Sequence, residues 1–310
     1  MGKIAFVFPG QGAQAVGMGK DAYETAERAK AIYDQADDLL GFKLSELIFN
    51  GPEDKLKLTY YTQPALLTTS YVYFELFKSK GIQPDFVAGH SLGEYSALVA
   101  AGALPFAAAV KTVHARGLFM DQAVPAGQGA MAAMLGADRD LLRDLCANVS
   151  RVTAAVEMAN INCPGQIVVS GTKEGVAAVI ARAGEAGAKR AIPLEVSGPF
   201  HSSLMQPAAE KLSAELAAVP FSDAKVPVVA NVTALPETAA DRIRELLVKQ
   251  VVSPVLWEDS VKWMIAQGVD TFYEIGSGTV LSGLIKKVDR SVKTIAINSV
   301  AAIAQTHANV

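Results

Sequence analysis

The chain has 310 residues, 51% of them hydrophobic, and its 28 basic and 31 acidic side chains give a net charge of −3. A chain of this length and composition can bury a large core in one domain or in two unequal ones. Because the charges nearly balance, the composition argues against a nucleic-acid-binding protein, which usually carries a basic excess or stripe.

Nothing in the sequence predicts export or a membrane span. The apolar run near the start, residues 4–8, is followed at once by Pro9 and is too short for a signal peptide. The most apolar segment, residues 97–110, is too short to cross a bilayer. Cys146 and Cys163 are too few for a disulfide framework. A reducing cytoplasm is therefore the expected location.

Strand-like and helical runs alternate along the first part of the chain. The expected elements are a strand at 4–8, helices at 21–40 and 63–80, a strand at 85–88, and helices at 94–100 and 105–122. Pro64 is acceptable in a first helical turn. A βα alternation of this kind predicts a parallel sheet covered by helices.

The elements become shorter after Pro125. They are a strand at 130–135, a helix at 138–148, strands at 153–159 and 166–170, a helix at 173–186 and a strand at 189–194. The order βαββαβ is the ferredoxin-like arrangement. The α/β pattern then resumes with a helix from 203, a strand at 227–230, helices at 239–251 and 257–267, a strand at 271–274 and a helix from 279. We therefore predict a small ferredoxin-like domain at 125–197, inserted into a large α/β domain made of 1–124 and 198–310.

Ser91 lies in Gly-His-Ser-Leu-Gly between an extended run and a helical run, which is the pattern of a nucleophile elbow. Gly89 and Gly93 suit the close backbone approach in such a turn. The turn exposes the hydroxyl and leaves the amide of Leu92 free at a helix N-terminus, where an oxyanion is favoured. Since a glycine-rich turn can contain a serine by chance, the flanking strand and helix are needed for this interpretation.

A serine nucleophile needs a base, and the chain has four histidines. His90 is next to Ser91, but adjacent side chains on an elbow point apart. His114 lies in the middle of a predicted helix, and His307 lies in a polar tail. His201 lies in a loop that leads into a helix, where catalytic groups are often placed. The alternative is that His201 is an ordinary solvent-exposed histidine.

The glycine-rich turn after the first strand, Gly10-Gln11-Gly12, can aim a second backbone amide at the elbow. The alternatives are a simple turn or a weak phosphate loop. The segment lacks both the P-loop spacing and the G-x-G-x-x-G spacing of a dinucleotide site.

Together these motifs resemble the malonyl-CoA:acyl carrier protein transacylases of bacterial fatty acid synthesis, which are relatives of polyketide acyltransferase domains. The resemblance covers nearly the whole chain. It is carried by Gly10-Gln11-Gly12, Gln63-Pro64-Ala65, Gly89-His90-Ser91-Leu92-Gly93-Glu94-Tyr95, Arg116-Gly117, Asn160-Ile161-Asn162, Phe200-His201-Ser202, Gln250 and Ile275-Gly276-Ser277-Gly278. It implies an α/β-hydrolase-like large domain with a ferredoxin-like insert.

The resemblance also implies roles for individual residues. Ser91 would accept the acyl group, His201 would be its base, and the amides of Gln11 and Leu92 would form the oxyanion hole. The family has no acidic third member, and a main-chain carbonyl at Gln250 would orient the histidine instead. This departs from ordinary α/β-hydrolases, whose acid falls between serine and histidine in the sequence.

Substrate choice would depend on Arg116, Phe200, His90 and Asn160. Arg116 would pair with the free carboxylate of malonate, for which a guanidinium fork is well shaped. Read without the resemblance, a helical arginine is usually solvated. Phe200 would fill the space of an α-methyl group, since related domains with serine there accept methylmalonyl groups. It is equally explained as a phenylalanine packed beneath His201.

The function implied is ping-pong malonyl transfer from malonyl-CoA to the phosphopantetheine thiol of an acyl carrier protein, with no bound cofactor or metal. The family suggests a monomer. A malonyl-specific enzyme of polyketide synthesis, a serine esterase or thioesterase, and a non-catalytic carrier-binding module are the alternatives. Basic residues that would dock an acidic carrier, or form only a solvated face, are Lys189, Arg190, Lys286, Lys287 and Arg290.

Overall fold

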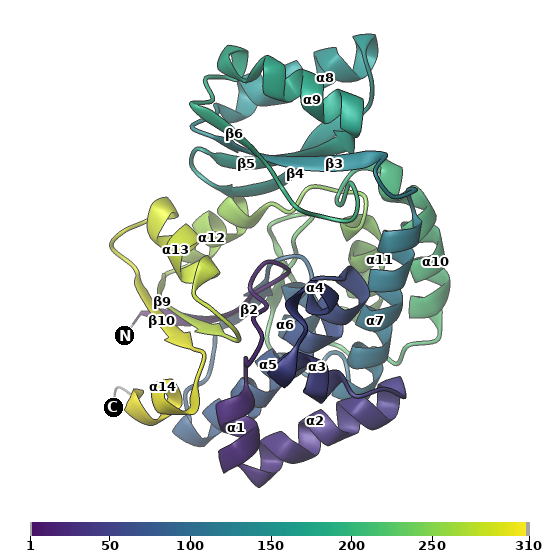
Figure 1. The fold of residues 1–310 in the computed structure, drawn as a ribbon. Helices are drawn as coiled ribbons and strands as arrows, with labels where there is room; N and C mark the ends of the chain where they lie inside the picture. Colours follow the sequence, from purple (N-terminus) through teal and green to yellow (C-terminus); the bar gives the residue numbers. More distant parts are fainter. Residues whose placement is uncertain (1, 308–310) are drawn as a thin grey trace.

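Two separate β-sheets organise the protein (Figure 1). The computed structural model describes residues 2–307, so residue 1 and residues 308–310, at the ends of the predicted large domain, lie outside the described part. The large sheet has six strands and the small sheet has four. In Figure 1 the small sheet and its two helices lie at the top, over the rest of the molecule.

The large sheet is parallel except at one edge. Its strands, in spatial order, are β10 (Lys293–Ile297), β9 (Val269–Ile275), β1 (Lys3–Phe8), β2 (Phe86–Gly89), β7 (Val228–Val229) and β8 (Pro236–Glu237). Only the β7–β8 pair is antiparallel. The parallel sheet expected from the βα alternation is thereby confirmed.

Helices cover both faces of this sheet. The helices outside the small sheet are α1 (Lys20–Thr25), α2 (Glu27–Leu40), α3 (Leu44–Asn50), α4 (Glu53–Leu56), α5 (Thr59–Phe77), α6 (Gly93–Ala100), α7 (Phe106–Gln122), α10 (Gln206–Ala217), α11 (Ala240–Gln250), α12 (Trp257–Ala266), α13 (Val280–Val288) and α14 (Val300–Gln305), with short 3-10 turns at Lys78–Lys80 and Ser203–Met205. Several of them, such as α2 and α10, pack mainly on other helices. Alternate residues of β1 serve the two faces. Phe6 and Phe8 join the core beneath α5 and α6, whereas Ala5 and Val7 join the core beneath α12 and α13.

Two helix predictions need correction. The helix expected at 21–40 is divided, because Ala26 has an extended backbone (φ −132°, ψ 115°); alanine favours helix so strongly that composition alone gives no sign of this break. The helix expected at 63–80 begins at Thr59, so Pro64 is in its second turn and not its first. Pro64 has no N–H for the Tyr60 carbonyl. His114 supplies a partner instead, since its Nδ1 lies 2.7 Å from that oxygen.

The small sheet has the predicted ferredoxin-like connectivity. It comprises β4 (Val156–Cys163), β5 (Gln166–Thr172), β3 (Gly129–Leu135) and β6 (Arg190–Pro193), in that spatial order, with α8 (Arg139–Val152), α9 (Lys173–Ala181) and a 3-10 turn at Ala183–Ala186. All of its strand pairs are antiparallel. The sheet lies within the predicted range 125–197, while the exact domain limits stay a prediction.

The small sheet is joined to the rest of the molecule beside Asn160. Val255, in the loop before α12, donates its amide to the Ala159 carbonyl and accepts from the Ile161 amide, both at 2.9 Å. A salt bridge between Arg139 and Asp259 adds a second link at 2.8 Å. These contacts bring the middle of β4 close to the end of β2, where Ser91 is found.

Candidate active site

Ser91 sits on a tight turn between β2 and α6, and its backbone is in the left-handed region with φ 51°. A Cβ on Gly89 would lie 1.9 Å from the Gly93 carbonyl, and one on Gly93 would lie 2.1 Å from the Phe8 carbonyl. Both glycines are therefore required by backbone packing, as the elbow pattern predicts. A non-glycine residue at positive φ is strained and persists only where its surroundings hold it.

Asn231 holds the strained turn on both sides. The Ser91 amide donates to Asn231 Oδ1 at 2.8 Å, and Asn231 Nδ2 donates to the Gly89 carbonyl at 2.7 Å. Asn231 is completely buried. Asn231 is not among the predicted site residues. It lies two residues after β7, the strand beside β2, and this place is a usable signal because polar groups at the carboxyl ends of parallel strands meet at one edge.

His201 is the histidine that meets the serine. Its Nε2 lies 2.8 Å from Ser91 Oγ, and its Nδ1 lies 2.9 Å from the Gln250 carbonyl. A carbonyl only accepts hydrogen bonds, so Nδ1 carries the proton and Nε2 is left to accept from the serine hydroxyl. The expected contacts of Ser91, His201 and Gln250 are thus present. His90 and His114 instead bond to Asn162 and to Tyr60.

The imidazole of His201 is held in its neutral form. Burial, together with the nearby charge of Arg116, lowers the pKa of His201 to about 3. A neutral imidazole with a free Nε2 lone pair is the form that can take a proton from Ser91. The environment therefore keeps the base ready over the whole neutral range.

Arg116 is a buried cation beside the nucleophile. Its side chain is 1% exposed. Nη1 donates to Gln63 Oε1 at 2.7 Å, and Nη2 donates to Gln250 Oε1 at 2.9 Å and to Ser91 Oγ at 3.3 Å. Among residues 2–307 its hydrogen-bond partners are all neutral, and its Nε has no acceptor. A buried charge without an ion partner is costly, so this arrangement suits an anionic group that arrives with a ligand.

Gln11 and Leu92, which line the same cavity as Ser91, both have backbone amides that are unpaired within residues 2–307. Leu92 is the N-cap residue of α6, and Gln11 follows β1 on the neighbouring loop. In the described part of the chain neither amide donates to a backbone or side-chain acceptor. Unpaired amides at a helix N-terminus can stabilise an oxyanion. The side chain of Gln11 is itself held at Thr59 Oγ1, 3.4 Å away.

A cavity of about 120 Å³ joins these groups. Its lining includes the predicted residues Gln11, His90, Ser91, Leu92, Arg116, Asn160, Phe200 and His201. Met131 of β3 and two residues that follow β6, Leu194 and Val196, also line it. This volume is well below the several hundred Å³ of a site for a drug-sized ligand, and it suits a small acyl group.

A serine–histidine pair, two free amides and a cation in one small cavity are the parts of an acyl-transfer site. A model of the acyl transferase domain matches residues 5–308. The chain belongs to the acyl transferase family. The resemblance inferred from the motifs is thereby confirmed.

Relatives of known name in this family are similar over nearly their full length. The malonyl CoA-acyl carrier protein transacylase of Bacillus subtilis (strain 168) is 59% identical over 298 residues, which cover 96% of this chain and 94% of the relative. An acyl carrier protein S-malonyltransferase from Vibrio cholerae has a crystal structure with a TM-score of 0.94, 44% identity, and coverage of 97% and 99%. A malonyl-transacylase solved with its type II PKS acyl carrier protein has a TM-score of 0.94, 42% identity, and coverage of 97% and 98%.

The other residues assigned from the family resemblance lie around the cavity. His90 Nε2 is 2.8 Å from Asn162 Oδ1, and burial lowers the pKa of His90. Asn160 is 7% exposed and Phe200 is 6% exposed. Gln250 lies behind the cavity and is fully buried. Gln63, which binds Arg116, is not among the predicted site residues, although it belongs to the Gln63-Pro64-Ala65 motif of the family resemblance.

The basic residues expected to dock a carrier protein come together only in part. Lys287 reaches Gln166 at 3.3 Å. Gln166 pairs with Leu135, and Leu135 pairs with Arg190, so Lys287, Lys189 and Arg190 share one end of the small sheet. The Lys286 ammonium, by contrast, binds the carbonyls of Arg290 and Val292 and so closes the end of α13.

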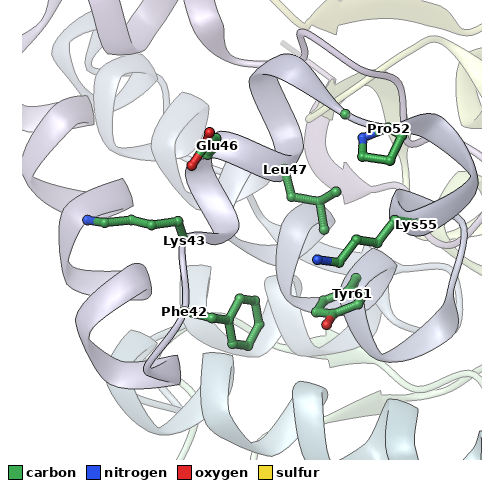
Figure 2. A pocket seen from close by; sticks show the side chains of 8 residues that line it. Phe42, Lys43, Glu46, Leu47, Pro52, Lys55 and Tyr61 are labelled. Carbon is green, nitrogen blue, oxygen red and sulfur yellow. The ribbon is translucent and has the colours of Figure 1, made fainter.

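A second hollow of about 310 Å³ lies among α3, α4 and the start of α5 (Figure 2). Leu47, Lys55 and Tyr61 are among its lining residues, and the Lys55 ammonium lies 5.2 Å from the Tyr61 ring centre. It contains neither Ser91 nor any residue in contact with Ser91. The acyl-transfer chemistry is therefore assigned to the smaller cavity.

Neither a metal cluster nor a membrane helix is found in the part of the chain that the structure describes. Residues 2–307 contain no group of three or more metal-ligating side chains placed to hold an ion. None of their helices combines the length and the apolar character needed to span a bilayer. The expectation that the reaction needs no bound cofactor stays a prediction.

Proposed function

We propose that the protein transfers the malonyl group of malonyl-CoA to the phosphopantetheine thiol of an acyl carrier protein. The product, malonyl-carrier protein, is the substrate for fatty acid chain elongation. The observation that carries the proposal is Arg116, a buried guanidinium 3.3 Å from Ser91 Oγ with no carboxylate partner in residues 2–307. A malonyl thioester brings the missing carboxylate. The names of the similar proteins support the same substrate pair.

In the first half-reaction, neutral His201 takes the proton of Ser91 as Oγ attacks the thioester carbonyl. The amides of Gln11 and Leu92 stabilise the oxyanion of the tetrahedral intermediate. The Gln250 carbonyl accepts from His201 Nδ1 at 2.9 Å and stabilises the imidazolium that forms. As the C–S bond breaks, His201 returns the proton to the sulfur of CoA, and malonyl-Ser91 remains.

In the second half-reaction the thiol of the carrier's phosphopantetheine enters the same site. His201 accepts the thiol proton while the sulfur attacks the malonyl ester. When the new intermediate collapses, the proton passes to Ser91 Oγ and the free serine is restored. Malonyl-carrier protein leaves, and the enzyme is ready for another malonyl-CoA.

Acyl choice follows from two side chains. Arg116 can pair with both oxygens of the malonyl carboxylate, and acetyl-CoA leaves the buried guanidinium unpaired. A site built around such a pair can reject the analogue that lacks it by on the order of 10⁴-fold. Phe200 occupies space next to His201 and disfavours an α-methyl branch. His90 and Asn160 complete the wall around the acyl group.

We propose the end of the small sheet that carries Lys189, Arg190 and Lys287 as the docking edge for an acidic carrier protein, because charge steering speeds such encounters. Lys286 and Arg290 contribute positive charge nearby. Charge reversal at Lys189 and Lys287 should raise the KM for the carrier and weaken its salt dependence. An unchanged KM and salt dependence would leave these residues as a solvated face.

The proposal is tested by the intact mass of the protein after incubation with malonyl-CoA. We expect a malonyl adduct that is absent in Ser91→Ala and that disappears when holo carrier protein is added. No adduct on Ser91 would overturn the transferase proposal and leave a carrier-binding module. Loss of the adduct in buffer alone, before carrier is added, would indicate a serine thioesterase.

Polyketide synthesis is the second candidate pathway, because one similar structure is a malonyl-transacylase bound to a type II PKS carrier protein. Comparing kcat/KM for a fatty acid carrier and a polyketide carrier separates the two. We further propose that the enzyme acts as a monomer in the cytoplasm, where its free, buried thiols at Cys146 and Cys163 would remain reduced.

A further inference from the structure

Glu94 is a buried acid directly behind the nucleophile, and the proposed reaction assigns it no step. It lies in the first turn of α6 and is 3% exposed. Its Oε2 accepts from Gln250 Nε2 at 2.8 Å and from the Asn231 amide at 3.1 Å. Both partners touch the catalytic groups, since Asn231 holds the Ser91 turn and the Gln250 carbonyl orients His201.

The carboxamide of Gln250 spans the gap between Glu94 and Arg116. Its Oε1 accepts from Arg116 Nη2 at 2.9 Å, while its Nε2 donates to Glu94 at 2.8 Å. Rotation of the amide by half a turn would place NH₂ against the guanidinium and the carbonyl oxygen against the carboxylate. Two flanking charges of opposite sign therefore permit only one orientation.

The charges of Glu94 and Arg116 also connect these two residues. The positive charge of Arg116, on the neighbouring helix α7, acts on Glu94, and the Arg116 guanidinium carbon lies 5.5 Å from the centre of the Tyr95 ring. Burial raises the pKa of Glu94 to about 7, and the Arg116 charge opposes that rise. A carboxylate one carboxamide away stabilises the buried cation and still leaves Nε without an acceptor among residues 2–307. The contact of Nη2 with Ser91 Oγ is long, at 3.3 Å, and can give way to a ligand oxygen.

We propose that Glu94 is a positioning residue that acts on Arg116 through the Gln250 carboxamide. It fixes the amide so that Oε1 holds Nη2 beside Ser91, where the acyl carboxylate must bind. The inference rests on the proposed function, because it assigns Arg116 to that carboxylate. Gln250 Nε2 also donates to the Ser91 carbonyl at 3.1 Å and to Asn231 Oδ1 at 3.2 Å. Without the Glu94 charge the amide keeps only these two weaker acceptors, so its hold on Arg116 loosens while Ser91 and His201 keep their places.

A double-mutant cycle tests this role. The variants are Glu94→Gln, which keeps the shape and an acceptor oxygen, Gln250→Met, which keeps the main-chain carbonyl, and the double variant. The exposed Glu24→Gln is the matched control. Labelling of Ser91 by a fluorophosphonate counts assembled sites. Acylation rates with malonyl-CoA and acetyl-CoA are then measured per labelled site.

We expect Glu94→Gln and Gln250→Met each to lower the malonyl-to-acetyl rate ratio about tenfold, which corresponds to one lost charge-assisted hydrogen bond. The double variant should lose no more than either single variant. If Glu94→Gln gives fewer labelled sites but an unchanged malonyl-to-acetyl ratio, the proposal is overturned and Glu94 has a structural role only. The same holds if the decreases in the ratio of the two single variants multiply in the double variant. If Glu94→Gln gives no labelled sites, the test rests on the single variant Gln250→Met. A wild-type malonyl-to-acetyl ratio in that variant overturns the proposal. Equal wild-type rates for both acyl groups would instead refute the proposed function.

Discussion

Replacement of Arg116 by alanine removes the only positive charge in hydrogen-bonding contact with Ser91 among residues 2–307. The substitution takes away the fork that we assign to the malonyl carboxylate, and it leaves the serine–histidine pair in place. Acetyl-CoA carries no such carboxylate. We therefore expect Arg116→Ala to lose malonyl transfer while acetyl transfer is retained or increased.

The size of the effect follows from the burial of the site. Two charge-assisted hydrogen bonds, each contributing about 1.5–3 kcal/mol, amount to about 3–6 kcal/mol in a fully buried pair. Because about 1.4 kcal/mol is a factor of ten, the malonyl-to-acetyl ratio of kcat/KM should fall by about 10²–10⁴. Solvent screening does not reduce this figure much, since the Arg116 side chain is 1% exposed.

The assay follows the mass of the acyl-enzyme at short times with each CoA ester, normalised to reactive Ser91. Arg116→Lys is the matched control, because it keeps the charge but cannot form the fork. Its ratio should fall between those of the wild type and Arg116→Ala. A malonyl-to-acetyl ratio in Arg116→Ala equal to that of the wild type would refute the carboxylate assignment.

Three further predictions follow from packing and protonation. Gly89→Ala should destabilise the protein by at least about 3 kcal/mol in thermal unfolding, because its Cβ would lie 1.9 Å from backbone. Gly283→Ala, at an exposed position of α13 with open space around its Cβ, should instead add about 0.5–1 kcal/mol. The pKa of His201 is lowered to about 3 on folding, so its share of stability is present above pH ~6.5 and is lost toward pH 3. Wild type should therefore lose about 2 kcal/mol more than His201→Asn between pH 7 and 5 in denaturant unfolding, and equal losses would contradict the burial argument. Glu94, whose raised pKa acts in the opposite direction, is common to both proteins and cancels. Phe200→Ser should raise the relative rate with methylmalonyl-CoA; no change in that rate would leave Phe200 a packing role only.

The features that sequence predicted well are local ones. A strand, a turn with glycines at fixed positions and a helix define the Ser91 elbow within a few residues, and the order of elements between 129 and 193 defines the small sheet. The choice of His201 came from its loop position and the family resemblance. Its contact with Ser91 spans 110 residues of sequence, a separation that no local pattern specifies.

The features that sequence missed depend on long-range contacts. Asn231 holds the elbow from 140 residues away. The helix around Pro64 begins earlier than the sequence predicts. Its first turn can precede the proline because His114, from another helix, contacts the Tyr60 carbonyl that Pro64 leaves without a donor. Glu94 belongs to the same motif as Ser91, yet the positioning role that we propose for it depends on its hydrogen bond with Gln250, 156 residues further along. Such partners are found only when the fold brings the segments together.

The role that we propose for Arg116 explains why a main-chain carbonyl, and not a carboxylate, contacts His201 Nδ1. Gln250 touches His201 through its carbonyl and Arg116 through its side chain, both at 2.9 Å. An acid at this point would therefore lie within reach of both groups. It would raise the pKa of His201, and it would pair with the guanidinium that we assign to the malonyl carboxylate. A neutral carbonyl fixes the imidazole tautomer without supplying a rival anion. The Glu94 carboxyl is separated from Arg116 by the Gln250 carboxamide, so in our proposal it balances part of the charge without pairing directly with the guanidinium.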